Sequence, residues 1–108
     1  MDHTTDYCVV LTTCENIDEA RKLASGLIEA RLAACIQISE ITSYYQWNGT
    51  LNTGREQLLL IKSKTSLYDR IEAFITGHHS YEIPEIVQIP IQGGLSSYLN
   101  WIDEVSEK

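Results

Sequence analysis

The feature that most constrains the fold is a long segment, residues 35–63, with the pattern of a β-hairpin. At its centre stands the dipeptide Asn48-Gly49. Both residues of a tight hairpin turn have to tolerate a positive φ angle, and Asn and Gly do so most readily. β-Branched and aromatic residues recur before the turn, and an apolar run, residues 58–61, follows it. The segment therefore predicts two long paired strands.

The first half of this hairpin changes its alternation part-way along. Ile36 and Ile38 fall in one phase, whereas the apolar residues from Ile41 onward fall in the other. A shift of one residue is what a β-bulge produces, because the extra residue moves later side chains to the opposite face. We therefore predict a bulge near residues 39 and 40.

The segments before the hairpin predict a strand and a helix. Residues 7–14 form an almost continuous apolar and β-branched run, typical of a strand covered on both faces. Asn16 is placed to cap the helix, with Glu19 three residues later as in a capping box. An apolar stripe follows at helical spacing: Ala20, Leu23, Ala24, Leu27, Ile28 and Leu32.

Three further elements follow the hairpin. A second amphipathic helix begins at Thr65 or Ser66, and Gly77 is placed to end it. Residues 85–92 predict a strand that Pro90 confines to a sheet edge. After Gly93-Gly94 a short helix closes the chain, with Tyr98, Trp101, Ile102 and Val105 on one face.

The predicted order is β-α-β-β-α-β plus a C-terminal helix. This order is typical of the α+β class, in the form of the ferredoxin-like split βαβ with helices on one face of an antiparallel sheet. At 108 residues we expect one domain, residues 1–108. The second and fourth strands then lie at the sheet edges, and long apolar edges favour pairing with another chain. We therefore expect an oligomer, with the tip aromatics Tyr44, Tyr45 and Trp47 at the interface.

Composition excludes some partners. The net charge is −7 and the eight Lys and Arg residues are scattered, so we expect no nucleic-acid binding. No apolar run approaches the ~18 residues of a membrane span, and the polar start of the chain, residues 1–7, does not resemble a signal peptide. We expect no membrane and a cytoplasmic location, where Cys8, Cys14 and Cys35 stay reduced as small buried thiols.

Six stretches resemble the CutA divalent-cation tolerance proteins in the family's order: VVLTTC, RLAACIQI, SYYQWNG, LLLIKS, HHSYEIPEI and SYLNWIDE. The resemblance covers nearly the whole chain. It implies a ferredoxin-like homotrimer, architecturally similar to the PII-type signalling proteins, in which the β-arms of neighbouring subunits interlock. It also implies copper or other divalent cations as partners and a regulatory or sensing role. A catalytic activity is not an established property of the family.

The adjacent histidines His78 and His79 are the candidate metal ligands. In a helix, neighbouring side chains point about 100° apart, and in a strand they point to opposite faces. The two imidazoles can therefore share one metal only at an irregular turn, which Gly77 makes plausible. Imidazole suits Cu(II), Zn and Ni. The alternative is that both histidines are solvated at a helix C-terminus, where the helix dipole favours imidazolium.

The resemblance implies a copper site made by this histidine pair with a cysteine of the first strand. Here the first-strand position is Thr12, and Cys14, two residues on, lies on the same side of an extended strand. The family's usual proline after the second histidine is replaced by Ser80, which leaves the turn less constrained. Relative to relatives that have that cysteine, we therefore expect weaker Cu(I) than Cu(II) binding, and Cys14 is the candidate substitute thiolate.

A second constellation is Cys35, Lys62, Tyr81 and Glu82. Cys35 and Lys62 lie at the base of the hairpin, and the loop before the last strand could bring Tyr81 and Glu82 to them within one chain or across a subunit boundary. Such a cleft fits a small anion or metabolite. A structural Lys62–Glu82 ion pair is the alternative.

The sequence has no phosphate loop and no G-x-S-x-G or H-E-x-x-H motif, so we expect no enzyme. The alternative function is a small enzyme that uses this cleft, or one that uses His79 with Glu82 as an acid–base pair.

Overall fold

The computed structural model describes residues 6–108. Most of the polar segment 1–7, which we expect not to be a signal peptide, therefore lies outside the described residues. Four strands and three α-helices follow one another, with a short 3-10 helix before the second helix. Their bounds are β1 Tyr7–Cys14, α1 Ile17–Glu29, β2 Cys35–Trp47, β3 Thr50–Lys64, η1 Thr65–Leu67, α2 Tyr68–His78, β4 Ile86–Pro90 and α3 Ser96–Val105. The predicted order of elements is confirmed.

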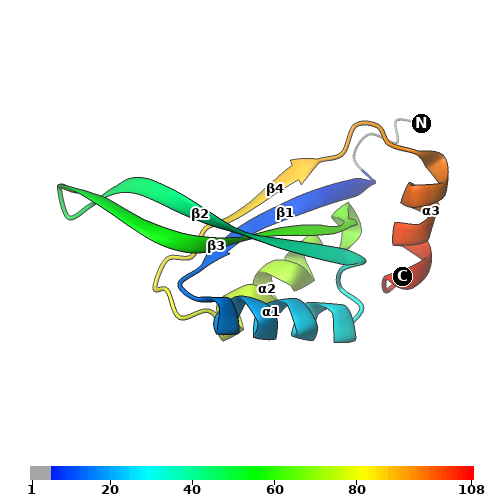
Figure 1. The fold of residues 1–108 in the computed structure, drawn as a ribbon. Helices are drawn as coiled ribbons and strands as arrows, with labels where there is room; N and C mark the ends of the chain where they lie inside the picture. The colour runs from blue at the N-terminus through cyan, green and yellow to red at the C-terminus, as the bar shows by residue number, and fades with distance from the viewer. Residues whose placement is uncertain (1–5) are drawn as a thin grey trace.

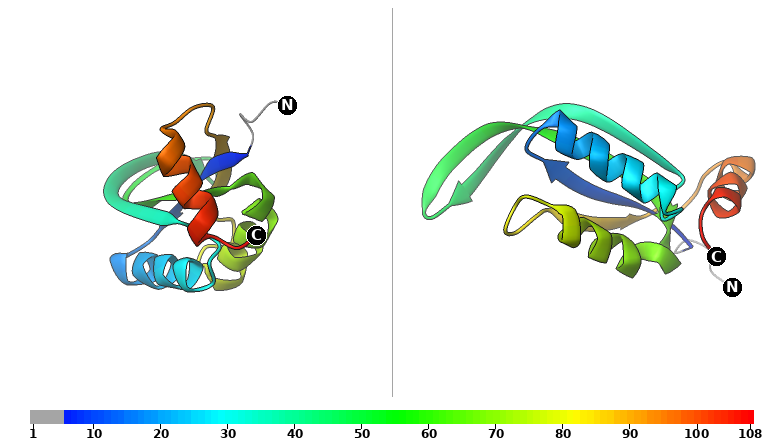
Figure 2. Two further views of the ribbon diagram at one scale, coloured as in Figure 1. Left: turned by 90° about the vertical axis from the view of Figure 1, so that its right-hand side faces the viewer. Right: turned by 90° about the horizontal axis from the view of Figure 1, so that it is seen from below.

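The four strands form one antiparallel sheet in the order β2-β3-β1-β4. This is the ferredoxin-like arrangement, with β2 and β4 at the two edges as predicted. Helices α1 and α2 lie side by side on one face of the sheet, and α3 lies at one end of it and leads to the C-terminus (Figures 1 and 2). No helix within residues 6–108 is long and apolar enough to cross a membrane.

The hairpin turn at Asn48-Gly49 is present as predicted, with φ angles of 54° and 75°. The predicted bulge is wrong. Pairing of β2 with β3 runs without interruption from Cys35 opposite Lys62 to Trp47 opposite Thr50. The apolar phase changes because only the first part of β2 faces the helices. Further along, no helix lies against the hairpin, and burial no longer dictates which phase is apolar (Figure 1).

The hairpin continues well past the rest of the sheet. β1 ends at Cys14, opposite Gln57, so within residues 6–108 no third strand pairs with the hairpin from Glu56 to the turn. We call residues 41–56, which begin with the pair Ile41–Glu56, the arm. It projects from the body in Figure 1, and the chain measures 46 × 26 × 22 Å.

Some of the sequence predictions for α1 and α2 are correct, and others are wrong. Asn16 caps α1, and its side-chain oxygen accepts a hydrogen bond of 2.9 Å from the backbone N–H of Glu19. Ile28, predicted within the apolar stripe, is 41% exposed and lies outside the core. Gly77 does not end α2, which continues through His78. Gly77 does not adopt a positive φ, so it supplies no left-handed stop.

The core lies between the sheet and the two helices. It contains alternate residues of the strands together with the inner faces of α1 and α2: Cys8, Val10, Leu59 and Ile61 with Leu23, Leu27, Ile71 and Ile75. The opposite face of the sheet is also apolar, and among the described residues the only helix on it is α3, which contacts it at Lys62 and Lys64 at one end. We call it the open face; it comprises Val9, Leu11, Leu58, Leu60, Val87 and Ile89. Val87 and Ile89 are 45% and 47% exposed there.

Gly26 lets α1 and α2 approach closely. A methyl group added at Gly26 would stand 2.6 Å from Cζ of Phe74 on α2, closer than van der Waals contact allows. The same ring stacks on His78 with a centroid distance of 4.3 Å. The spacing of the two helices is therefore linked to the position of His78.

We expect Gly26→Ala to lower the free energy of unfolding, because overpacking costs about 1–3 kcal/mol and outweighs a gain of about 1 kcal/mol in helix propensity. Gly77→Ala is the matched control, since nothing lies within 4 Å of a methyl group there. It should be neutral or slightly stabilising. Urea unfolding followed by circular dichroism measures both, and an equal effect of the two substitutions would contradict the packing argument.

Candidate functional site

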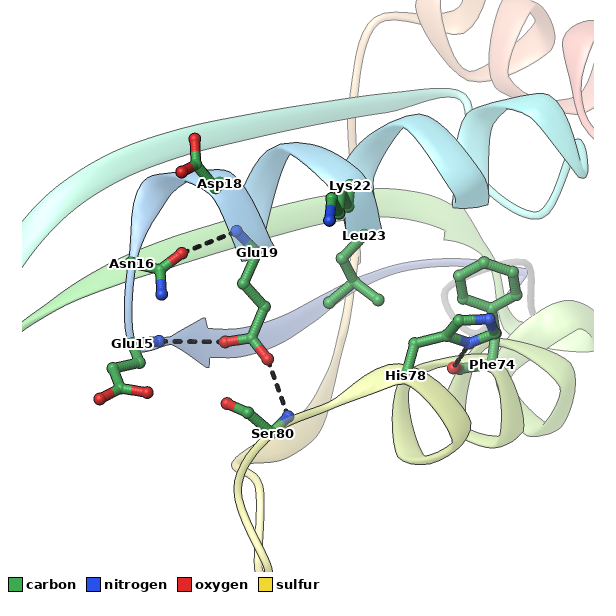
Figure 3. A pocket seen from close by; sticks show the side chains of 9 residues that line it. All are labelled: Glu15, Asn16, Asp18, Glu19, Lys22, Leu23, Phe74, His78 and Ser80. Carbon is green, nitrogen blue, oxygen red and sulfur yellow. Dashed lines mark hydrogen bonds between the residues drawn. The ribbon is translucent and has the colours of Figure 1, made fainter.

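His78, one of the two predicted metal ligands, lines a hollow between the start of α1 and the end of α2 (Figure 3). Its volume is about 480 Å³. The lining combines carboxylates, an apolar floor and one imidazole: Glu15, Asn16, Asp18, Glu19, Lys22, Leu23, Phe74, His78 and Ser80. The hollow is mostly acidic at its rim, in keeping with a chain of net charge −7.

His78 is the last residue of α2 and keeps one ring nitrogen for an outside ligand. Its Nδ1 lies 2.7 Å from the carbonyl oxygen of Phe74. A carbonyl only accepts, so Nδ1 carries the hydrogen and donates it. In the neutral ring the lone pair is then on Nε2, for which no hydrogen bond is found within residues 6–108. The stack on Phe74 holds the ring in this orientation.

His79 is oriented differently because the helix has ended and its backbone is extended, with φ −93° and ψ 142°. Its Nε2 donates to the carbonyl oxygen of Thr13 on β1 at 2.6 Å. Its Nδ1 accepts from the backbone N–H of Tyr81 at 3.0 Å. Both ring nitrogens are therefore engaged by the protein.

The two histidines thus do not form a ready chelate. His78 fits a borderline cation such as Cu(II) or Zn(II) through Nε2, whereas His79 has to give up a hydrogen bond before it can ligate one. No group of three or more His, Cys, Asp or Glu side chains within the described part of the chain is arranged to hold a metal ion. His3, the remaining histidine, lies outside the described residues.

The first strand offers no ready thiolate. Thr12 is fully buried, and its hydroxyl has no hydrogen-bond partner within the described residues. Cys14 is also fully buried on the helix side of the sheet. Burial, with smaller contributions from the charges of Glu19 and Glu56, raises the pKa of the Cys14 thiol to about 12. At neutral pH this thiol keeps its proton, and a thiol has to lose it to bind a metal.

Glu19 holds the loop after α2 against α1, and sequence reasoning placed it only as a capping residue. One carboxylate oxygen accepts from the backbone N–H of Ser80 at 2.7 Å, and the other accepts from the backbone N–H of Glu15 at 3.3 Å (Figure 3). Partial burial works to raise the pKa of Glu19, but the hydrogen bonds from Ser80 and Glu15 outweigh it and lower the pKa. The capping spacing was the only signal for this residue.

Glu56 is a functional candidate that the sequence did not indicate. Its carboxylate accepts a hydrogen bond of 2.8 Å from the hydroxyl of Tyr81. Burial and then this hydrogen bond raise the pKa of Tyr81 above its ordinary value. The ring of Tyr81 also lies against that of His79, with centroids 4.9 Å apart. A glutamate within a strand carries no local signal for such a long-range contact.

The predicted second constellation is divided between two ends of the sheet within one chain. Cys35 and Lys62 are cross-strand partners as expected. Tyr81, however, contacts Glu56, which lies six residues from Lys62 along β3, about 20 Å away. The ammonium of Lys62 stands over the ring of Tyr98, 5.6 Å from its centroid. A cleft that joins Cys35 and Lys62 to Tyr81 and Glu82 therefore needs a second subunit and stays a prediction.

The arm exposes large apolar side chains. Tyr44, Tyr45 and Trp47 are 73%, 49% and 50% exposed, and Leu51 is 71% exposed. In an antiparallel pair, side chains alternate between the two faces. Tyr45 and Trp47 therefore lie on one face of the arm, and Tyr44 lies on the other. Both faces of the arm have apolar surface that the chain itself does not cover.

Comparison with known proteins adds to this geometry. The model of the CutA1 divalent ion tolerance protein family matches residues 8–105, which include all three helices and the sheet except Tyr7. The chain belongs to the CutA1 divalent ion tolerance family. The family is named for tolerance of divalent ions and not for a reaction.

Relatives of this CutA1 chain cover much of its length. The divalent-cation tolerance protein CutA of Thermus thermophilus is 40% identical over 97 residues, which are 89% of this chain and 94% of that protein. Mouse protein CutA is 38% identical over 88% of the chain, but the match spans only 54% of the mouse protein. The chain therefore spans about half the length of the first curated relatives that it matches.

Solved CutA1 structures share the fold. The crystal structure of CutA1 from Shewanella sp. SIB1 superposes with a TM-score of 0.93 at 38% identity, covering 97% of this chain and 99% of that one. The names of relatives differ in compartment. One from Arabidopsis thaliana is called chloroplastic, and a structure from Archaeoglobus fulgidus is called periplasmic.

We expect Glu19→Gln to destabilise the protein by about 1 kcal/mol at pH 7, because the carboxylate holds Ser80 and Glu15. The lowered pKa of Glu19 means that this stability is present above the ordinary glutamate pKa and is lost as pH falls through the folded-state value. The difference between wild type and Glu19→Gln should therefore shrink by pH 3.

Urea unfolding at pH 7 and at pH 3 measures this difference. Asp18→Asn is the matched control, because it removes the same charge from the same helical turn without touching the loop. A Glu19→Gln effect no larger than that of Asp18→Asn, or one that persists unchanged at pH 3, would show that the carboxylate does not hold the loop.

Proposed function

We propose that the protein is a homotrimeric, divalent-cation-binding member of its family, with a PII-like regulatory or sensing role and copper as the preferred ion. Its assembly buries the arm and the open face between copies. Its cation contacts involve His78 and His79. The observation that carries the assembly is the combination of an uncovered apolar sheet face with an arm that has no third strand beside it.

The arm and the open face both favour association with copies of the same chain. A two-stranded ribbon alone is marginally stable in water, and Tyr44 and Trp47 gain burial only in a neighbour. The open face adds a second apolar surface on the body. β2 and β4 present unpaired backbone edges that can extend the sheet into another copy.

The cation proposal depends on the tautomer of His78. Because Nδ1 of His78 donates a hydrogen bond to the carbonyl oxygen of Phe74, the neutral ring presents its lone pair on Nε2. The acidic rim of the hollow raises the local concentration of cations, but carboxylates alone do not favour copper over magnesium, whereas nitrogen ligands do. The family name supports divalent ions in general.

We propose a cytoplasmic site of action and, as the alternative ligand, a small anion or metabolite in an inter-subunit cleft at Cys35 and Lys62.

The arm makes a direct prediction about assembly. We expect Trp47→Ala to weaken trimer formation, because truncating a buried aromatic costs about 3–5 kcal/mol. Sedimentation equilibrium at micromolar concentration should give a trimer for the wild type and smaller species for the variant. Far-UV circular dichroism should show that the variant chain remains folded. A wild-type mass near the chain mass of 12.2 kDa would overturn the trimer, and an unweakened Trp47→Ala trimer would remove the arm from the interface.

The histidines predict modest, pH-dependent Cu(II) affinity. Binding should weaken as the pH falls, because protons compete with the metal for its nitrogen ligands. Calorimetric titration compares His78→Ala and the double variant His78→Ala/His79→Ala with the wild type. All proteins carry His3→Ala, because His3 is the one other histidine of the chain. Equal Cu(II) affinity with and without His78 and His79 would mean that these residues are only a polar helix end.

A further inference from the structure

A chain of hydrogen bonds connects the second histidine to the arm. His79 donates to the carbonyl of Thr13 at the end of β1, and it accepts from the backbone N–H of Tyr81. The hydroxyl of Tyr81 in turn donates to Glu56 on β3. Three segments far apart in sequence therefore meet through the loop that joins α2 to β4.

Glu56, the last residue of this series of hydrogen bonds, lies where the arm joins the body. β1 pairs with β3 as far as Cys14 opposite Gln57, and Glu56 is the next residue toward the turn. It faces Ile41 across the hairpin, so this pair is the root of the arm. Tyr81 thus ties the body to the first residue of β3 that has no partner on β1. Beyond this contact, neither β1 nor β4 pairs with the ribbon.

The same loop is held at its other side by α1. Ser80 donates its backbone N–H to Glu19, and His79 is half-buried against Tyr81. The loop is therefore held at His79 and Ser80, the two residues that precede Tyr81, and these contacts place the tyrosine beside Glu56. His78, whose hydrogen bond lies within α2, takes no part in this network.

We infer that His79 is a positioning residue, which latches the loop to β1 so that Tyr81 holds the root of the arm through Glu56. The two adjacent histidines then have separate roles. His78 presents a free nitrogen to the hollow, and His79 sets the direction of the arm that assembly uses. Loss of the latch should loosen the arm and leave the rest of the sheet unchanged.

Cation binding affects this latch, a link that rests on the proposed function. Both nitrogens of His79 are engaged, so a cation that takes this ring has to displace either the Thr13 carbonyl or the Tyr81 N–H. Binding of a cation to both histidines then unlatches the loop. Through Tyr81 and Glu56 it loosens the arm, which links cation binding to assembly.

Hydrogen exchange of the intact protein, followed by mass spectrometry, tests the latch. Tyr81→Phe removes only the hydroxyl that reaches Glu56, and His79→Ala removes both hydrogen bonds of the ring. We expect exchange of the arm amides, residues 41–56, to rise about 3- to 10-fold in both variants, as loss of one net hydrogen bond predicts. Exchange of β1 should stay as in the wild type.

Matched controls separate this role from general destabilisation. Tyr98→Phe removes a tyrosine hydroxyl at the other end of the sheet, and His78→Ala removes the neighbouring imidazole; both should leave arm exchange unchanged. His79→Gln keeps one donor and one acceptor and should restore much of the protection lost in His79→Ala. If Tyr81→Phe exchanges like wild type in the arm, or if His78→Ala loosens it as much as His79→Ala, the latch is overturned.

A second experiment adds Cu(II), in the His3→Ala background, at a concentration that calorimetry shows to be saturating. We expect Cu(II) to raise arm exchange in the protein with His79 but not in His79→Gln. Cu(II) that binds without changing arm exchange would overturn the link and leave the proposed function standing. A protein that binds no Cu(II) at all would overturn the proposed function, while the variant comparison would still decide the latch.

Discussion

The unequal lengths of β1 and the β2–β3 hairpin determine most of what this structure can do. β3 has 15 residues, but β1 pairs with only the eight from Gln57 to Lys64. Over this stretch the sheet has three or more strands and is covered on one face by helices. Beyond it, the same hairpin continues as a two-stranded arm, which is marginally stable unless other surfaces support it. The proposed burial of the arm in a neighbouring copy, and the proposed role of the contact at the arm's root, both rest on this mismatch.

Much of the fold was predictable because local and long-range signals agreed. The Asn48-Gly49 turn, the cap at Asn16 and the order of elements were read correctly from periodicity and turn chemistry. The predicted bulge was wrong for a physical reason: alternation reports the buried face only where one face is buried. In the arm neither face is covered by the chain itself, so the apolar phase there was free to change. Gly77 was misread because a glycine ends a helix only when it adopts a positive φ, and the sequence does not state that angle.

The candidate site was predictable only as a set of residues, not as an arrangement. The sequence placed His78 and His79 together, and it could not show that one ring faces α2 while the other reaches β1. That difference follows from where α2 ends, which is at His78, one residue after the predicted end at Gly77. Glu56 escaped prediction entirely, because a strand glutamate has no local signature for a contact with a tyrosine 25 residues later. The pairing of Cys35 with Lys62 was correct because hairpin register follows from the turn, whereas the reach of the loop bearing Tyr81 does not.

The proposed latch would also limit how tightly the paired histidines could hold a cation. Releasing His79 from one of its hydrogen bonds costs about 0.5–1.5 kcal/mol, so a metal that uses both rings binds about 2- to 13-fold more weakly than it would to rings already free. Linkage makes this relation reciprocal: the cation weakens the latch by the same factor by which the latch weakens the cation. A metal held by His78 alone escapes this factor but has no effect on the arm. Affinity and signal are therefore opposed at this site, and a site that reports on cations through the arm has to bind them less tightly than a site built only to hold them.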